Sequence, residues 1–139
     1  MAKVNETFCL YIPSKTIFIE TVLDLAESFF KINLNNESVI NSEIASISEA
    51  VSNAIIHGNK KDPGKDVYLT INIKDNSVIT KIEDSNKKYY DYLKNYKYDK
   101  EDILKSSGRG LFIIETYMDN ISLKKGKKGT IIKMEKSLK

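Results

Sequence analysis

Three stretches of the chain alternate apolar and polar side chains. The first runs from residue 4 to residue 12 and ends at Pro13; the second and third, at residues 67–73 and 78–82, are separated by the turn-forming segment KDNS. Alternation is the period of a strand with one buried face. These stretches therefore predict one strand followed later by an antiparallel hairpin, and the apolar runs near residues 120–124 and 130–135 predict two closing strands.

Three other stretches repeat apolar residues at helical spacing. The first follows Ser14, a plausible N-cap, and carries Phe18, Val22, Leu25 and Phe29. The second carries an isoleucine-rich stripe from Ile40 to Ile55 with Gly58 as its expected C-cap. The third is expected over 108–118. The segment 85–107 is polar and tyrosine-rich, with one possible short helix at 101–104, and is expected to be a long functional or mobile loop.

The predicted order is strand, helix, helix, strand, strand, helix, strand, strand. Because strands and helices are grouped more than alternated, we expect an α+β fold. Its form would be a two-layer sandwich, with a mixed, mainly antiparallel sheet carrying helices on one face. The chain has 139 residues, which fits a single domain over 1–139.

Composition narrows the class of protein. The net charge is +3, and Cys9 is the single cysteine, so an internal disulfide is excluded and a reducing cytoplasm fits. No apolar run approaches the roughly 18 residues of a membrane span, which predicts a cytoplasmic protein without a membrane partner. The lysine cluster KKGKKG at 124–129 lies between two apolar runs. A solvated hairpin loop explains it better than nucleic-acid binding does.

The segment EAVSNAIIHGN at 49–59 carries the first candidate chemistry. Helical geometry places Ser46, Glu49, Asn53 and His57 on one stripe, roughly opposite the apolar stripe. A solvated face is one interpretation, but no Lys or Arg occurs from residue 32 to 59 in a chain with 22 of them. We therefore expect this stripe to line a pocket.

Glu49 can act as a base, and the Asn53 amide oxygen suits a hard cation such as Mg²⁺. His57 is equally explained as a favourable charge at a helix C-terminus. Zinc is poorly supported by one His and one Cys.

Two further groups complete the constellation. In SSGRGLFII, Gly108 and Gly110 flank Arg109 at the expected start of a helix, where backbone N–H groups and the helix dipole favour phosphate. Asp84 follows Val78, Thr80 and Ile82 in phase and is expected to point to the core side at a strand end, where a carboxylate needs a partner. A ligand amine or an ordinary turn explains that aspartate equally well.

Together and in this order, these pieces resemble the ATPase domain shared by histidine kinases and gyrase, and most closely the small anti-sigma-factor serine kinases. EAVSNAIIHGN resembles the Asn-containing box of that branch, IED the start of its adenine box, and SGRGLFIIETYMD its glycine-rich box; KGT resembles its closing Gly-Thr. The likeness spans essentially the whole chain. It implies an ATP–Mg²⁺-dependent serine-protein kinase that phosphorylates a small antagonist protein, sequesters a sigma factor and forms a homodimer.

The resemblance also implies roles for individual residues. Glu49 would be the catalytic base and Asn53 the Mg²⁺ ligand. Asp84 would bind the adenine amino group, with Thr130 in the same network. The phosphates would lie against Gly108, Arg109 and Gly110. His57, Asn86 and Leu111 would complete the set of residues around the cofactor.

One departure from the family pattern supports a second hypothesis. The adenine box usually runs D-x-G-x-G, but here it reads Asp84-Ser85-Asn86-Lys87-Lys88. Asn86 tolerates a positive φ better than most residues, which is one way to keep the turn. The alternative function is a partner-binding module of the same fold that binds nucleotide weakly or is not catalytic.

Overall fold

The computed structural model describes residues 5–94 and 106–139, with side chains described from 111 onward in the second range. Five strands form one sheet in the order β1-β2-β3-β5-β4, and all four neighbouring pairs are antiparallel. The strands are β1 (Asn5–Pro13), β2 (Asp66–Lys74), β3 (Ser77–Glu83), β4 (Asn120–Lys125) and β5 (Thr130–Ser137). The expected strands and the hairpin are confirmed, and β1 and β4 are the two edges.

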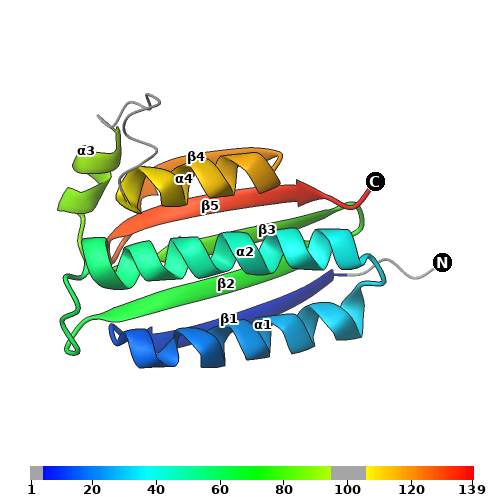
Figure 1. Ribbon diagram of the computed structural model, residues 1–139, viewed down its shortest axis with the longest axis horizontal. Helices are drawn as coiled ribbons and strands as arrows, with labels where there is room; N and C mark the ends of the chain where they lie inside the picture. The colour runs from blue at the N-terminus through cyan, green and yellow to red at the C-terminus, as the bar shows by residue number, and fades with distance from the viewer. Residues whose placement is uncertain (1–4, 95–105) are drawn as a thin grey trace.

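Helices cover one face of this sheet (Figure 1). They are α1 (Ile19–Asn33), α2 (Glu37–Asn53), α3 (Lys88–Lys94) and α4 (Ser106–Tyr117). α2 lies in the middle of the layer and packs against both α1 and α4, whereas α3 lies at one end of the sheet (Figure 1). The α+β two-layer architecture expected from the element order is therefore confirmed.

The core lies between the two layers and is built from cross-strand rows. One row runs from Leu10 on β1 through Leu69, Ile82 and Ile132 to Leu123 on β4. Above these rows Ile47 and Val51 of α2 and Ile55 of the turn that follows it are fully buried. Burying one such aliphatic side chain contributes roughly 1.5–3 kcal/mol, so this row and the α2 stripe set the register of helix on sheet.

The start of the first helix differs from the expectation. Ser14 does not cap it: its hydroxyl donates to the carbonyl oxygen of Lys65 at 2.6 Å, and a 3₁₀ turn at Thr16–Phe18 precedes α1. The buried face is Val22, Ala26 and Phe30, while Leu25 is 43% exposed. Val22 and Phe29 of the expected stripe still pack in or against the core, whereas Leu25 does not.

Two other expectations change. The segment 88–94, expected to belong to a polar loop, forms α3 because Tyr89 and Leu93 bury four residues apart. The short helix expected at 101–104 lies outside the described residues. Among the described helices, none is long and apolar enough to cross a membrane.

Candidate functional site

Asp84 directly follows β3 and is the centre of the site. Its strand phase turns the side chain inward as expected, and the residue is 2% exposed. Its Oδ1 accepts two backbone hydrogen bonds, from the N–H of Asn86 at 2.9 Å and from that of Thr130 at 2.8 Å. Because Thr130 begins β5, these two bonds fix the carboxylate between two neighbouring strands.

The second carboxylate oxygen, Oδ2, is left beside glycine. A Cβ at Gly58 would overlap Oδ2, and a Cβ at Gly129 would overlap the backbone of Asp84 and Asn86. No hydrogen bond from another described residue reaches Oδ2. The prediction that Gly58 is the C-cap of the second helix is wrong. α2 ends at Asn53, the π-helical turn Ala54–Gly58 follows it, and the φ of Gly58 is not positive. Gly58 provides space next to an oxygen that can still accept a hydrogen bond.

The turn after Asp84 is kept without glycine by the side chain of Asn86. A positive φ at this residue was one way to keep the turn, but the left-handed non-glycine residues of the described chain are Lys60 and Lys61. Instead, the Asn86 amide nitrogen donates to the carbonyl of Gly58 at 2.7 Å, and its amide oxygen accepts the N–H of Lys88 at 3.0 Å. The hydroxyl of Thr130 donates to the Asn86 carbonyl at 2.8 Å. The structure thus brings Asp84, Asn86 and Thr130 into one hydrogen-bond network.

Burial sets the charge state of this network. It raises the pKa of the Asp84 carboxyl to about 6, and the two backbone N–H groups oppose the rise. The carboxylate is therefore mostly ionised at neutral pH and accepts hydrogen bonds only. Burial, together with the charge of Asp84, raises the pKa of the Tyr89 hydroxyl, which keeps that phenol neutral.

The stripe on α2 is not a solvated face. Asn53 is 5% exposed, while Glu49 and His57 are half-buried. The amide of Asn53 forms no hydrogen bond with another described residue, so its two donors and its acceptor are not used within that part of the chain. Burial and the nearby Lys60 lower the pKa of His57, so its ring is neutral at pH 7. Its suggested role as a charged partner of the helix dipole is therefore disfavoured.

A cavity of about 430 Å³ adjoins this site. Its lining combines residues of the Asp84 turn, the end of α2 and α3: His57, Lys60, Asn86, Lys88, Tyr89 and Tyr92. The rings of Tyr89 and Tyr92 stack at an angle of 12° with centroids 5.9 Å apart. Lysine ammonium groups and flat aromatic walls are the chemistry that phosphates and bases require.

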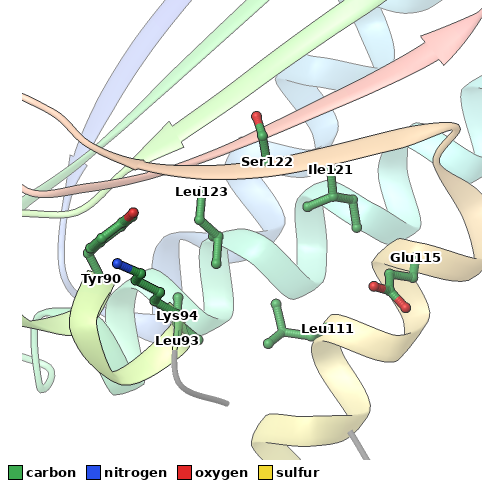
Figure 2. Close-up of a pocket in the computed structure, with 8 residues that line it drawn as sticks. All are labelled: Tyr90, Leu93, Lys94, Leu111, Glu115, Ile121, Ser122 and Leu123. Atoms are coloured by element: carbon green, nitrogen blue, oxygen red, sulfur yellow. The ribbon is translucent and has the colours of Figure 1, made fainter. Parts of the chain in front are cut away.

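The glycine-rich segment is only partly described. Residues 108–110 lie in the first turns of α4, the place that a phosphate-binding role requires, and the side chain of Arg109 lies outside the described part. Leu111 is buried and lines a separate cavity of about 370 Å³ between α3, α4 and β4, where it lies opposite Ile121 and Leu123 (Figure 2). Leu111 is therefore not among the residues that line the cavity beside Asp84.

Sequence reasoning missed Asn59 and Glu43. Asn59 is fully buried; its amide donates to the Ser14 hydroxyl at 2.8 Å and accepts the N–H of Ser85 at 2.7 Å, tying the end of β1 to the Asp84 turn. It was hidden in a segment typical of turns. Glu43 is also fully buried, below Thr80 of β3. The lack of lysine on α2 was a signal that its polar residues, including this acid, are enclosed.

These donors fit ATP with Mg²⁺ better than a protein-held transition metal. Within the described residues no group of three or more His, Cys, Asp and Glu side chains is placed to hold a metal ion. An amide oxygen such as that of Asn53 suits Mg²⁺, which keeps several waters and takes the rest of its ligands from phosphates. The free Asp84 Oδ2 beside Gly58 suits an exocyclic amine.

Comparison with known proteins agrees with a site for ATP. The family described as histidine kinase-like ATPase domain matches residues 12–136. The anti-sigma F factor of Anoxybacillus flavithermus is 34% identical over 95 residues, which cover 66% of this chain and 65% of that protein. The match thus spans just under two thirds of the relative.

Two solved structures share the fold. One contains the RsbU and RsbW domains of a Mycobacterium tuberculosis protein, with a TM-score of 0.69, 16% identity, and coverage of 94% of this chain and 32% of that one. The other is the SiaB–SiaC complex of Pseudomonas aeruginosa, with a TM-score of 0.67, 15% identity, and coverage of 94% and 88%.

Proposed function

The chain belongs to the histidine kinase-like ATPase family, and from this membership we propose that it binds ATP with Mg²⁺ and phosphorylates a serine of a small regulatory protein. The proposal rests mainly on the Asp84 carboxylate, of which only one oxygen accepts hydrogen bonds from described residues. Oδ1 accepts two backbone N–H groups, while Oδ2 lies against Gly58 and accepts no hydrogen bond from another described residue. That arrangement is a ready acceptor for the amino group of adenine.

Each of the site residues would have a distinct role in nucleotide binding or phosphoryl transfer. Asp84 orients the base through Oδ2, and Thr130 holds Asp84 and the turn at Asn86 in place. Asn53 presents a buried amide oxygen to Mg²⁺, which neutralises phosphate charge when bound. Glu49, one turn earlier on α2, accepts or orients the proton of the incoming hydroxyl.

The phosphates would lie at the start of α4. Backbone N–H groups of a helix start favour negative charge, and residues 108–110 occupy that place. Phosphoryl transfer requires positioning and charge stabilisation more than covalent chemistry. Gly108, Arg109 and Gly110 are assigned that role, with His57, Asn86 and Leu111 contributing to the surroundings of the cofactor.

The proposed partners follow from the relatives. Because proteins named anti-sigma F factor are similar to this chain, we assign it to an anti-sigma-type switch in the cytoplasm whose partners are a sigma factor or its antagonist. A homodimer is supported by the edge strand β1 and by three exposed apolar residues before and along α1, namely Ile17, Leu25 and Ile32. Light scattering on wild type and on Ile32→Glu tests the dimer, which the acidic variant should dissociate.

A test of the enzyme assignment combines binding with transfer. A thermal shift with ATP and Mg²⁺ is expected for the wild type, because a ligand that binds the folded state raises its stability. Asp84→Asn and Asn53→Ala should remove the shift, while Lys31→Ala, in an exposed ion pair with Glu27 on α1, should keep it. Labelled ATP and proteins recovered from the native cell then test transfer, which Glu49→Ala should abolish.

The alternative of a non-catalytic partner-binding module has its own support. Lys88 occupies a position where the family pattern has glycine, and it lines the cavity beside Asn86. Absence of a thermal shift at millimolar ATP, with partner binding retained, would establish this module. A shift without transfer would mean nucleotide binding without kinase activity.

A further inference from the structure

The sheet face opposite the helices carries an unusual row of side chains. Along each strand, every second side chain points to the exposed face of the sheet. Directly paired residues of neighbouring strands therefore form rows across that face. In one row Cys9 is opposite Thr70, and Thr70 is opposite Lys81. Lys81 is in turn directly opposite Lys133 of β5. Two lysines therefore occupy directly paired positions near the middle of this face.

A direct lysine pair is unfavourable unless something compensates for it. Like charges opposite one another on a sheet are destabilising, and directly opposed Cβ atoms are about 4.5–5.5 Å apart. Both lysines are half-buried, which limits their freedom to separate. Among the described residues neither ammonium group forms an ion pair with a carboxylate.

The pair borders a hollow of about 340 Å³, which we call the lysine hollow. It is lined by Thr7, Thr70, Asn72, Lys74, Ile79, Lys81 and Lys133. Three of these seven residues are lysines and none is acidic. The Asn72 amide donates to the Thr7 hydroxyl at 2.6 Å, which fixes the polar floor of the hollow between β1 and β2.

Two acidic residues lie near the hollow, but neither forms an ion pair with Lys81 or Lys133 in the described part of the chain. The carboxylate of Glu83, two residues after Lys81, already accepts the backbone N–H groups of Lys128 and Gly129 at 2.8 and 3.0 Å. Glu135 shares a face with Lys133 but forms no ion pair with it in the described chain. The hollow is therefore locally positive in a protein whose net charge is only +3.

We propose that the lysine hollow docks an acidic segment of a protein partner, with partner carboxylates between Lys81 and Lys133. Charge complementarity is the argument: an anion converts a repulsive pair into two attractive contacts and steers association. Single-stranded nucleic acid fits less well, since the lining of the hollow contains no aromatic side chain on which a base could stack. A membrane fits less well because Ile79 is the one apolar residue of the lining.

The test uses a matched pair of double variants. Lys81→Gln/Lys133→Gln removes the pair, and Lys15→Gln/Lys127→Gln removes the same charge from exposed sites outside the hollow. The probe is a fluorescein-labelled peptide of about eight glutamates in about 50 mM salt, followed by anisotropy. We expect the hollow variant to bind about tenfold more weakly than wild type, and the control variant less than about twofold more weakly.

Two further readouts separate docking from charge alone. Backbone amide shifts of Thr70, Lys81 and Lys133 should move on peptide addition, and the thermal midpoint of the hollow variant should be equal to or above that of wild type. No peptide binding, equal loss in both double variants, or shift changes elsewhere would overturn the proposal. Tighter lysine-dependent binding of an oligothymidine, or of vesicles with about 30% phosphatidylserine, would replace the protein partner by that anion.

Discussion

Two buried carboxyl groups lie near β3, one above the strand and one directly after it, and their surroundings differ. Glu43 accepts one hydrogen bond, from the Thr80 hydroxyl at 2.8 Å, and its Oε2 is sealed without a partner among the described residues. Asp84 accepts two backbone N–H groups, and its Oδ2 lies in a space kept by glycine. Burial raises both pKa values, to about 7 for Glu43 and about 6 for Asp84.

The difference shows what distinguishes a binding carboxylate from an enclosed one. Backbone donors favour the charged form of Asp84 and fix its direction, whereas a single hydroxyl leaves Glu43 close to neutral. The absence of a Cβ at Gly58 and Gly129 lets Asp84 pack against both glycines, while the Glu43 side chain lies between α2 and the sheet. A raised pKa by itself would rank Glu43 first, so the surrounding space and the fixed donors are the better guides to the site.

The largest expected effect concerns the pH dependence of stability. The pKa of Glu43 rises from 4.5 to about 7 on folding, so the folded state binds more protons in this window and stability falls as pH rises through it. The loss is about 3 kcal/mol, since one pKa unit corresponds to about 1.4 kcal/mol. Urea unfolding of wild type and Glu43→Gln between pH 4.5 and 8 measures it.

The glutamine variant should lose most of this slope, especially near pH 7, where Glu43 titrates and Asp84 is already mostly ionised in the folded state. Asp84→Asn provides the comparison, since it should change the slope mainly below pH 6. Equal slopes in wild type and Glu43→Gln would show that Glu43 is not the enclosed acid described here.

The second effect tests the space around Asp84. Gly129→Ala places a methyl group against the backbone of Asp84 and Asn86, and should cost about 2 kcal/mol of unfolding free energy. Gly64→Ala is the matched control, because its new Cβ would meet only the side-chain oxygen of Asp62 at 3.3 Å. Thermal or urea unfolding measures the stability loss of each variant. Similar losses in Gly129→Ala and Gly64→Ala would contradict the close packing of Asp84 against Gly129.

The third effect is the pH dependence of the proposed nucleotide binding. Protonation of Asp84 below about pH 6 removes an acceptor, so ATP affinity should fall about tenfold between pH 7 and pH 5. Titration calorimetry with Mg²⁺–ATP measures it. In Glu43→Gln the same fall should persist, because that residue does not face the ligand; a fall abolished by this variant would reverse the two roles.

The smallest effect compares two buried threonines. Thr80→Val leaves Glu43 without its hydroxyl donor and should cost about 1 kcal/mol in unfolding free energy at pH 5. Thr130→Val removes a bond to the Asn86 carbonyl, but its N–H still holds Asp84. We expect a smaller stability loss there and a clear loss of ATP affinity. A larger stability loss for Thr130→Val than for Thr80→Val would contradict the difference described between the surroundings of Glu43 and Asp84.

Much of this protein was determined by local sequence. Alternation fixed the strands, because a period of two has only one assignment of faces, and the isoleucine stripe of α2 fixed its buried side. The in-phase position of Asp84 and the Asn53 stripe were predictable for the same reason. Together with the family motifs, they located the candidate site before any contact was known.

The tertiary structure decided what local patterns cannot encode. Gly58 and Gly129 are required by the approach of residues 26 positions or more away along the chain, and Ser14 and Asn59 bond across 45 positions. α3 became a helix only because the end of the sheet buries Tyr89 and Leu93. The Lys81–Lys133 pair depends on the register of β3 with β5. Sequence periodicity reports which side of an element is buried, whereas these features depend on which elements meet, and that is settled by packing.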